Sequence, residues 1–175
     1  MLLDESGFML QPVVRRTWAP RGQTPVQWEW DRHDRLSVIS GLSLSPRRRR
    51  LGPYWEIYRH NLRGEQVVGF LRLLRRHLRR KIILVLDRWS VHRAAVVRRF
   101  LQGHCKSIEV EWLPSYAPEL NPVEQVWNHA KYSDLANVAP ANLPELDSLV
   151  RSSILNARGQ QRLLRSFFRT AKLRL

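Results

Sequence analysis

The sequence predicts an α/β protein built from layers of helix and sheet. Three observations lead to this fold class. The chain opens with segments rich in residues that suit a pleated sheet, continues with alternating helical and strand-like patterns, and closes with helical patterns alone. Its 175 residues fit a single domain, residues 1–175, and contain no internal repeat or low-complexity linker.

Three strand segments open the chain. We expect the first over residues 2–10, the second over 36–44 and the third over 54–59, because all three are rich in residues that suit a sheet. Only the loop SPRRRRLGP separates the second segment from the third. We therefore expect these two strands to pair, which gives the sheet an antiparallel opening.

From Gly64 the apolar period changes to that of a helix. Apolar residues recur there at three- and four-residue steps, at Val67, Phe70, Leu71, Leu74 and Leu78. The segment KIILVLD then predicts a fully buried strand that ends at Asp87. A strand over residues 108–113 is expected further on, after a helix through Val91, Ala95, Val96 and Phe100.

Two capping signals mark helices in the last third. Asn121 precedes Pro122, so it is expected to cap a helix whose first turn contains Glu124. In the segment NLPE, residues 142–145, the Asn stands three residues before the Glu and predicts the start of another helix. A last, basic helix is expected over about residues 160 to 173.

Charge and composition narrow the class of partner. The chain has 30 Lys and Arg against 15 Asp and Glu, a formal net charge of +15 at pH 7, which favours nucleic acid first and an anionic membrane surface second. Its one cysteine, Cys105, excludes an intramolecular disulfide and suits a reducing cytosol. The longest strongly apolar run, IILVL, is far short of the ~20 residues that span a bilayer. Asp4 and Glu5 precede any apolar stretch of signal-peptide length, so we expect a cytoplasmic protein.

Three acidic side chains are candidate metal ligands: Asp4 in the first strand, Asp87 at the end of the buried strand, and Glu124 in the first turn of a helix. If the fold brings them together, a cation must offset their repulsion, and carboxylate oxygens suit Mg²⁺ or Mn²⁺. Two such ions about 3.5–4 Å apart activate a water and stabilise the leaving oxygen in phosphodiester cleavage. Each acid taken alone is also typical of a turn, a cap or a solvated surface group.

The sequence around these acids resembles a known family. The segments DESGF, RRTWAPRGQTP, ILVLDRWSVH and LPSYAPELNPVEQVWNHAK closely resemble, in order, the motif blocks of DDE-type transposases from bacterial insertion sequences of the mariner superfamily. The resemblance covers about residues 2–131. It implies an RNase H-like fold with a mixed five-stranded sheet flanked by helices, and a catalytic acidic triad at Asp4, Asp87 and Glu124. The separation of the last two acids resembles that of this group and makes Glu124, rather than Glu119, the third ligand.

The resemblance also implies a function. Enzymes of this kind use metal ions to cleave one DNA strand, release a 3′-hydroxyl and join it to target DNA, generally at TA dinucleotides, which are pyrimidine–purine steps that kink readily. They usually carry an N-terminal helix-turn-helix region, and because only three residues precede Asp4 we expect a catalytic half without it. The expected partners are double-stranded DNA and either a second copy in a homodimer or a separately encoded recognition half. The expected location is a bacterial cytoplasm, on the nucleoid when DNA is bound.

One departure from the family leaves an alternative function open. Related sequences commonly carry Asn directly after the second acid, whereas here Arg88 follows Asp87 and its guanidinium could compete with a metal for the carboxylate. The alternative is a catalytically impaired remnant that binds DNA or a partner subunit without cleaving. His92 and Asn121 are expected to support the site, although His92 also fits a hydrogen-bonding residue at a helix start.

The proline-rich approach to Glu124 has two interpretations. Pro114, Pro118 and Pro122 restrict the backbone between the last strand and the helix, which would fix the position of the carboxylate. The alternative is a simple turn with Trp112 and Trp127 in the core.

Basic side chains outside the triad are candidates for DNA contact. The run RRRR in the loop before the third strand is expected to bind phosphates, although basic loops are also often merely solvated. Its members are Arg47, Arg48, Arg49 and Arg50. Lys131, at the end of the last motif block, is expected to contact DNA as well.

Overall fold

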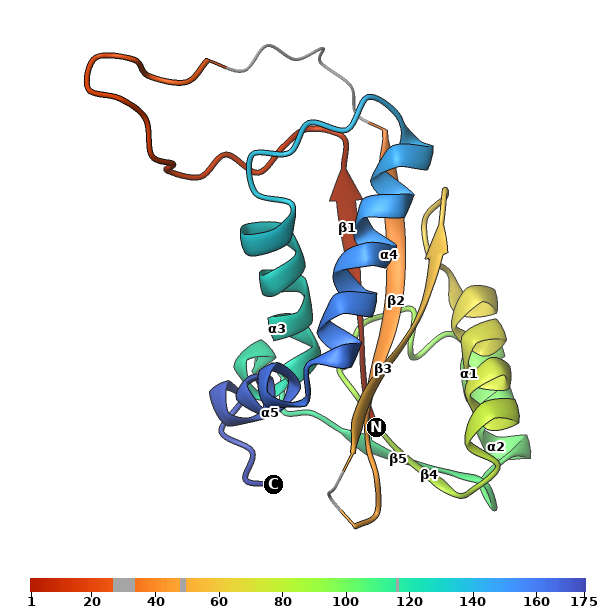
Figure 1. The fold of residues 1–175 in the computed structure, drawn as a ribbon. Helices are drawn as coiled ribbons and strands as arrows, with labels where there is room; N and C mark the ends of the chain where they lie inside the picture. The colour runs from red at the N-terminus through yellow and green to blue at the C-terminus, as the bar shows by residue number, and fades with distance from the viewer. Residues whose placement is uncertain (27–33, 48–49, 116) are drawn as a thin grey trace.

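The computed structural model describes residues 1–26, 34–47, 50–115 and 117–175, and in it a sheet lies between two layers of helices (Figure 1). The strands are β1 (Leu2–Met9), β2 (Arg35–Leu44), β3 (Leu51–Tyr58), β4 (Ile82–Leu86) and β5 (Ile108–Trp112). The helices are α1 (Gly64–Leu78), α2 (Ala95–Gly103), α3 (Pro122–His129), α4 (Leu143–Gly159) and α5 (Gln161–Thr170), with a short 3-10 turn at Pro118–Leu120 and a π-helical turn at Ala130–Asp134. Each segment expected from the sequence is therefore present.

The sheet is mixed and has the strand order β3-β2-β1-β4-β5. β2 pairs antiparallel with β3, as predicted, and also with β1. β4 joins β1 in parallel, and β5 joins β4 in parallel. β1 is thus the central strand, with Asp4 opposite Ser40 of β2. A mixed five-stranded sheet flanked by helices is confirmed.

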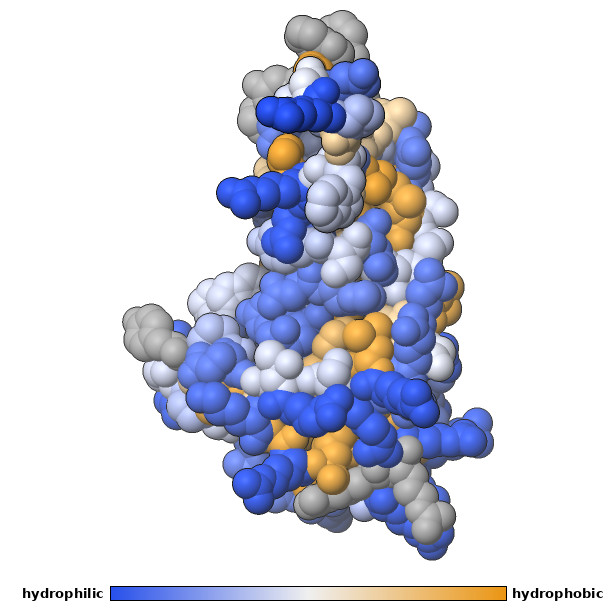
Figure 2. All heavy atoms as spheres, turned by 60° about the vertical axis from the view of Figure 1, so that its left-hand side comes forward, coloured by the Kyte–Doolittle hydropathy of each residue, from blue (hydrophilic) through white to orange (hydrophobic). Residues whose placement is uncertain are grey.

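Each face of the sheet has its own core. Leu2 and Phe8 of β1 pack with α3, α4 and α5, in a cluster whose largest members include Trp127 and Phe168. Leu3 packs on the opposite face with α1 and α2. Because side chains alternate along a strand, Asp4 points to the α3 side and Glu5 to the α1 side. Figure 2 shows that the outer surface on the α3 and α5 side is mostly hydrophilic, with smaller apolar patches.

Two details of the expected elements are wrong. β4 is not fully buried, because Ile83 is 54% exposed and lines an open cavity at the end of the sheet. α2 begins at Ala95, so Val91 precedes the helix, and Val97 joins Phe100 on the buried side. The residues before it form tight turns, in which the amide of His92 donates to the carbonyl of Trp89 at 3.1 Å.

The two predicted helix caps are present. Asn121 Oδ1 accepts a hydrogen bond from the Val123 amide at 3.2 Å, and Asn142 Oδ1 accepts one from the Glu145 amide at 2.9 Å. Each helix also has a proline in its first two positions, Pro122 in α3 and Pro144 in α4, and a proline has no amide hydrogen that would need an acceptor there. Over the part of the chain that is described, no helix is long and apolar enough to cross a membrane.

Candidate active site

The three predicted acids come together at one end of the sheet. Asp4 lies on the central strand, Asp87 directly follows β4, and Glu124 lies in the first turn of α3. All three line the same two cavities, of about 610 and 540 Å³, and Trp89 lines both as well. As they stand, no three His, Cys, Asp or Glu side chains among the described residues are close enough together to hold a metal ion. The three acids share a site because they line the same cavities. Their side chains must move closer together to bind one cation.

Asp4 is buried on the α3 side of the sheet. Its carboxylate is 8% exposed, and Oδ2 accepts a hydrogen bond from Trp127 Nε1 at 2.9 Å. Burial, followed by the nearby charges of Glu124 and Glu5, raises the pKa of Asp4 to about 8. The metal-free protein thus holds this carboxyl in a place that favours its neutral form, and the bond from Trp127 only partly offsets that preference.

Asp87 is held by a buried histidine. His92 Nδ1 donates to Asp87 Oδ1 at 2.7 Å and Nε2 donates to Glu5 Oε1 at 2.8 Å, so the ring lies between two carboxylates. Burial alone would lower the pKa of His92, but the two hydrogen bonds and charges outweigh it and raise the pKa to about 10. The ring is therefore an imidazolium. Its hydrogen bond lowers the pKa of Asp87, and the amide of Trp89 adds a second bond to Oδ1 at 2.9 Å.

Glu124 is placed by the N-terminus of α3. Asn121 caps the helix and also donates from Nδ2 to the carbonyl of Leu3 at 3.2 Å, which ties the start of α3 to β1. Burial raises the pKa of Glu124, while the positive charge of Lys131 lowers it in part. Lys131 is half-buried in the π-helical turn after α3, and its Nζ donates to Ser6 Oγ at 2.7 Å. The lysine thus lies close enough to Glu124 and Asp4 to interact with their charges, although it lines neither of their two cavities.

Two residues of this arrangement were not singled out in the sequence. Glu5 was noted only as a charge near the N-terminus, yet it is the second carboxylate on His92. Trp127 was considered only as a core residue, and it is both buried and the donor to Asp4. Trp112, its expected companion in the core, is 39% exposed. The sequence offers one signal for Glu5: an acid beside Asp4 on a strand that is buried on both faces must have a polar partner.

The basic residues are divided between the two ends of the sheet. Arg88 is exposed and lines the smaller acidic cavity, and across the described ranges it forms no ion pair with Asp87. Arg47 and Arg50 are exposed in the turn between β2 and β3, at the end of the sheet away from Asp87. Arg48 and Arg49 lie outside the described residues.

The donor set of the site fits a divalent cation. Within the described structure, Asp87 Oδ2 and the carboxylate of Glu124 have no hydrogen-bond donor, so both can turn to a metal. Hard cations such as Mg²⁺ and Mn²⁺ prefer carboxylate oxygens of this kind. A bound cation would also oppose the effect of burial on the pKa values of Asp4 and Glu124, since its charge favours their ionised forms.

Solved structures with a similar fold include several of the Mos1 transposase. The Mos1 strand transfer complex matches with a TM-score of 0.68 at 17% identity, covering 98% of this chain and 50% of that chain. The Mos1 mariner paired end complex with Mg matches with a TM-score of 0.69 at 14% identity, covering 98% and 52%. The catalytic domain of Mos1 mariner transposase matches with a TM-score of 0.62 at 13% identity, covering 98% and 75%. This chain spans about half the length of the proteins in the first two structures.

The mixed sheet and the acidic end of β1 and β4 define an α/β domain of the RNase H-like class. The chain belongs to the DDE superfamily endonuclease family, whose sequence model matches residues 1–147. A comparison with curated proteins found no significant match. The predicted DDE family and RNase H-like fold are confirmed, whereas a bacterial origin stays a prediction.

Proposed function

We propose that this chain is the catalytic domain of a transposase, which cleaves DNA strands and transfers them in a metal-dependent reaction during transposition of an insertion sequence. The single observation that carries the proposal is the convergence of Asp4, Asp87 and Glu124 on shared cavities from three separate elements. Membership of an endonuclease family and the likeness to a protein solved in a strand transfer complex support it.

The three carboxylates are the proposed ligands of Mg²⁺ or Mn²⁺, with two ions as the expected number. One of the similar Mos1 complexes was solved with Mg. When bound, such ions supply an activated water and stabilise the leaving oxygen of the phosphodiester.

The chain's own residues prepare the site for that chemistry. The His92 imidazolium occupies Asp87 Oδ1, which leaves Oδ2 directed to a ligand, and Trp127 holds Asp4 in a comparable way from the other face. Asn121 fixes the helix start that carries Glu124. Lys131 compensates part of the negative charge while no cation is bound. These residues are positioning residues, because each acts through a carboxylate.

The proposed substrate is double-stranded DNA, comprising transposon ends and target sites, with TA as the expected target. Arg88 and Lys131 line or adjoin the acidic site and are suited to contact the phosphates of a strand bound there. Action as a homodimer, or together with a separately encoded recognition half, belongs to the same proposal. Arg47 and Arg50, in the β2–β3 turn at the other end of the sheet, stay proposed contacts for DNA phosphates outside the acidic site.

The test is nicking of supercoiled plasmid by the purified chain with and without Mg²⁺, with Asp87→Asn as the matched inactive variant. We expect nicks that require Mg²⁺ and that disappear in the variant. Plasmid binding without any Mg²⁺-dependent nicking would instead support the impaired remnant. That alternative is favoured by Arg88 in the second motif and opposed by the lack of an ion pair between Arg88 and Asp87 within the described ranges.

A further inference from the structure

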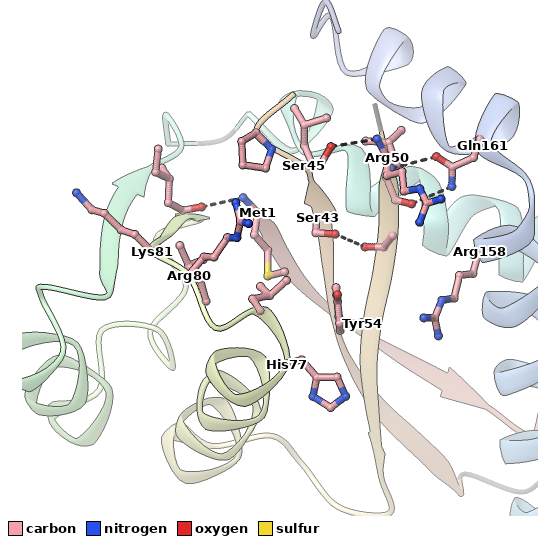
Figure 3. Close-up of a pocket in the computed structure, with 17 residues that line it drawn as sticks. Met1, Ser43, Ser45, Arg50, Tyr54, His77, Arg80, Lys81, Arg158 and Gln161 are labelled. Atoms are coloured by element: carbon pink, nitrogen blue, oxygen red, sulfur yellow. Dashed lines mark hydrogen bonds between the residues drawn. The ribbon is translucent and has the colours of Figure 1, made fainter. Parts of the chain in front are cut away.

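A second cavity lies at the opposite end of the sheet from the acids (Figure 3). Its volume is about 830 Å³, and it is enclosed by the end of β2, the start of β3, the end of α1, the start of β4 and the junction of α4 with α5. It shares no lining residue with the two acidic cavities. Ile83 in this cavity and Asp87 just after β4 are four positions apart, roughly 13 Å of extended strand.

The lining of this cavity is basic. Arg50, Arg80, Lys81 and Arg158 line it, and no Asp or Glu is among its described lining residues. Lys81 has an acidic partner, Glu109, with Nζ and Oε2 2.6 Å apart, but both side chains are about half exposed and such a pair is weak. The three guanidinium groups have no acidic partner in the described part of the chain. Their charge is permanent, and no acidic group among the described residues neutralises it.

The guanidinium groups enter the cavity from different walls. Figure 3 shows Arg158 reaching from the helical side toward Tyr54 and Arg80 reaching from the opposite side, whereas Lys81 extends outward. Arg50 lies in the turn before β3, next to Gln161 in the same view. The three arginines thus surround the space that they line, which is the arrangement required to bind more than one phosphate oxygen.

The remaining wall is apolar and aromatic. Tyr54 and His77 pack edge to face, with ring centroids 6.1 Å apart. The other apolar members of the lining are Met1, Leu44, Pro46, Leu51, Leu78, Ile82 and Ile83. A ligand that uses the whole cavity must therefore combine anionic groups with a flat apolar face.

The walls of the cavity are fixed to one another. The side-chain amide of Gln161 forms two hydrogen bonds with the backbone of Leu51: its oxygen accepts from the Leu51 amide at 3.0 Å, and its nitrogen donates to the Leu51 carbonyl at 2.9 Å. These are the bonds that a neighbouring strand would form. Ser43 Oγ donates to the Gly52 carbonyl at 2.9 Å. The start of β3, which carries Arg50 at its edge, is thereby joined to the helical junction that carries Arg158. The backbone positions of the two arginines are therefore linked before any ligand binds.

We propose that this cavity binds a nucleotide unit of a DNA strand, with phosphate oxygens on Arg50, Arg80 and Arg158 and a base or sugar against the wall of Tyr54 and His77. A free phosphate ion would fill little of an 830 Å³ cavity and would leave its apolar wall unused. An acidic peptide would supply carboxylates without flat faces. The net charge of +15 favours a polyanion over a free phosphate ion, and among polyanions only a nucleic acid also offers flat bases to the apolar wall. The site goes beyond the proposed function, because it lies apart from the carboxylates and needs neither metal nor cleavage.

The first test measures binding of a short, fluorescein-labelled thymidine oligonucleotide to the full chain in EDTA, over a range of salt concentrations. The double variant Arg80→Ala/Arg158→Ala is compared with Arg98→Ala/Arg99→Ala, which removes the same charge from the exposed side of α2. Each phosphate contact on a single strand adds about 0.7 to the slope of log K against log salt. We expect the first variant to lose about 1.4 from this slope and the second to keep the wild-type slope. Equal slopes in the two variants would overturn the proposal.

The second test locates the oligonucleotide on the unaltered protein. A 4-thiothymidine oligonucleotide is photocrosslinked in EDTA, and the labelled peptides are identified by mass spectrometry. We expect crosslinks near Tyr54 and His77 that persist in Asp87→Asn. Crosslinks confined to the peptides of Asp87 or Glu124 would refute the site, as would complete displacement of the oligonucleotide by inorganic phosphate or polyglutamate at matched charge. Crosslinking at the basic cavity with no plasmid nicking would contradict the proposed function alone, and the reverse result would contradict this inference alone.

Discussion

Replacing Asp4 by Asn is expected to make the metal-free protein more stable. The carboxyl is buried beside Glu124 and Glu5, and its pKa is raised from 3.8 to about 8. At pH 7 the unfolded chain has this group ionised, whereas the folded chain holds it largely protonated. Folding must therefore take up a proton that is scarce at this pH, and Asn removes that requirement while its Oδ1 still accepts from Trp127 Nε1.

The magnitude follows from the difference between the two pKa values. Taking up the proton costs about 1.4 kcal/mol for each pH unit above 3.8, which is about 4 kcal/mol at pH 7 and between about 1 and 2 kcal/mol at pH 5. An amide N–H left without an acceptor offsets about 1–2 kcal/mol of this gain. We therefore expect Asp4→Asn to stabilise the protein by about 2 kcal/mol at pH 7, a rise in Tm of roughly 4–8 °C, and to have almost no effect at pH 5.

The assay is thermal unfolding followed by circular dichroism in EDTA at pH 5 and pH 7. Asp87→Asn is the control, because the hydrogen bond from His92 lowers the pKa of Asp87 and its ionised form stabilises the fold. The control is expected to lower Tm at pH 7, opposite in sign to Asp4→Asn. A fall in Tm for Asp4→Asn at pH 7, or a change of the same sign in both variants, would show that burial does not disfavour the charge on Asp4.

Three further predictions concern the same end of the sheet. His92→Gln leaves two carboxylates without their cation, and we expect urea unfolding at pH 7 to show a loss of about 3–5 kcal/mol, so an unchanged midpoint would exclude a buried imidazolium. The stability of the metal-free wild type is expected to fall as pH rises, for two reasons. The raised pKa of Asp4 lowers the free energy of unfolding increasingly between pH 3.8 and about 8. The stabilisation from His92 is complete below pH 6.5 and is lost as pH rises through about 10. A Tm that increases from pH 5 to pH 9 would contradict both assignments. Asn121→Ala removes a cap and the bond to the Leu3 carbonyl, so we expect a loss of about 1–2 kcal/mol and weaker Mg²⁺ binding by calorimetry. Asn121→Asp keeps the cap but sets a buried carboxylate oxygen against the Leu3 carbonyl, so it should be destabilising too, and wild-type stability in both variants would contradict this role.

The local structure of the site was predictable from the sequence. The position of Asn121 directly before a proline identified the start of α3, because a capping side chain and a residue without an amide donor are both favoured there. The apolar run before Asp87 identified the end of β4 in the same way. Resemblance to a known family then connected these positions with Asp4, a connection that spacing and period do not provide.

The contacts between distant residues were not predictable. Alternation along β1 determines that Glu5 points away from Asp4, but it does not reveal that a histidine 87 residues further along the chain lies there. The arginines of the β2–β3 turn illustrate the same limit, since their charge indicates an anionic partner without indicating the end of the sheet at which they lie. That location follows only from the pairing of β2 with β1 and β3.

Adjacent acids on opposite faces of β1 make the assembly of the site sensitive to strand alignment. A shift of β1 by one position against β2 would exchange the two side chains, so that the longer Glu5 would meet Trp127 and the shorter Asp4 would fail to reach His92. Such a misaligned chain would bury two unmatched charges, one in each layer, and would be disfavoured during folding. Asp4 and Glu5, which both belong to the acidic site, therefore also favour the correct register of β1 in the sheet.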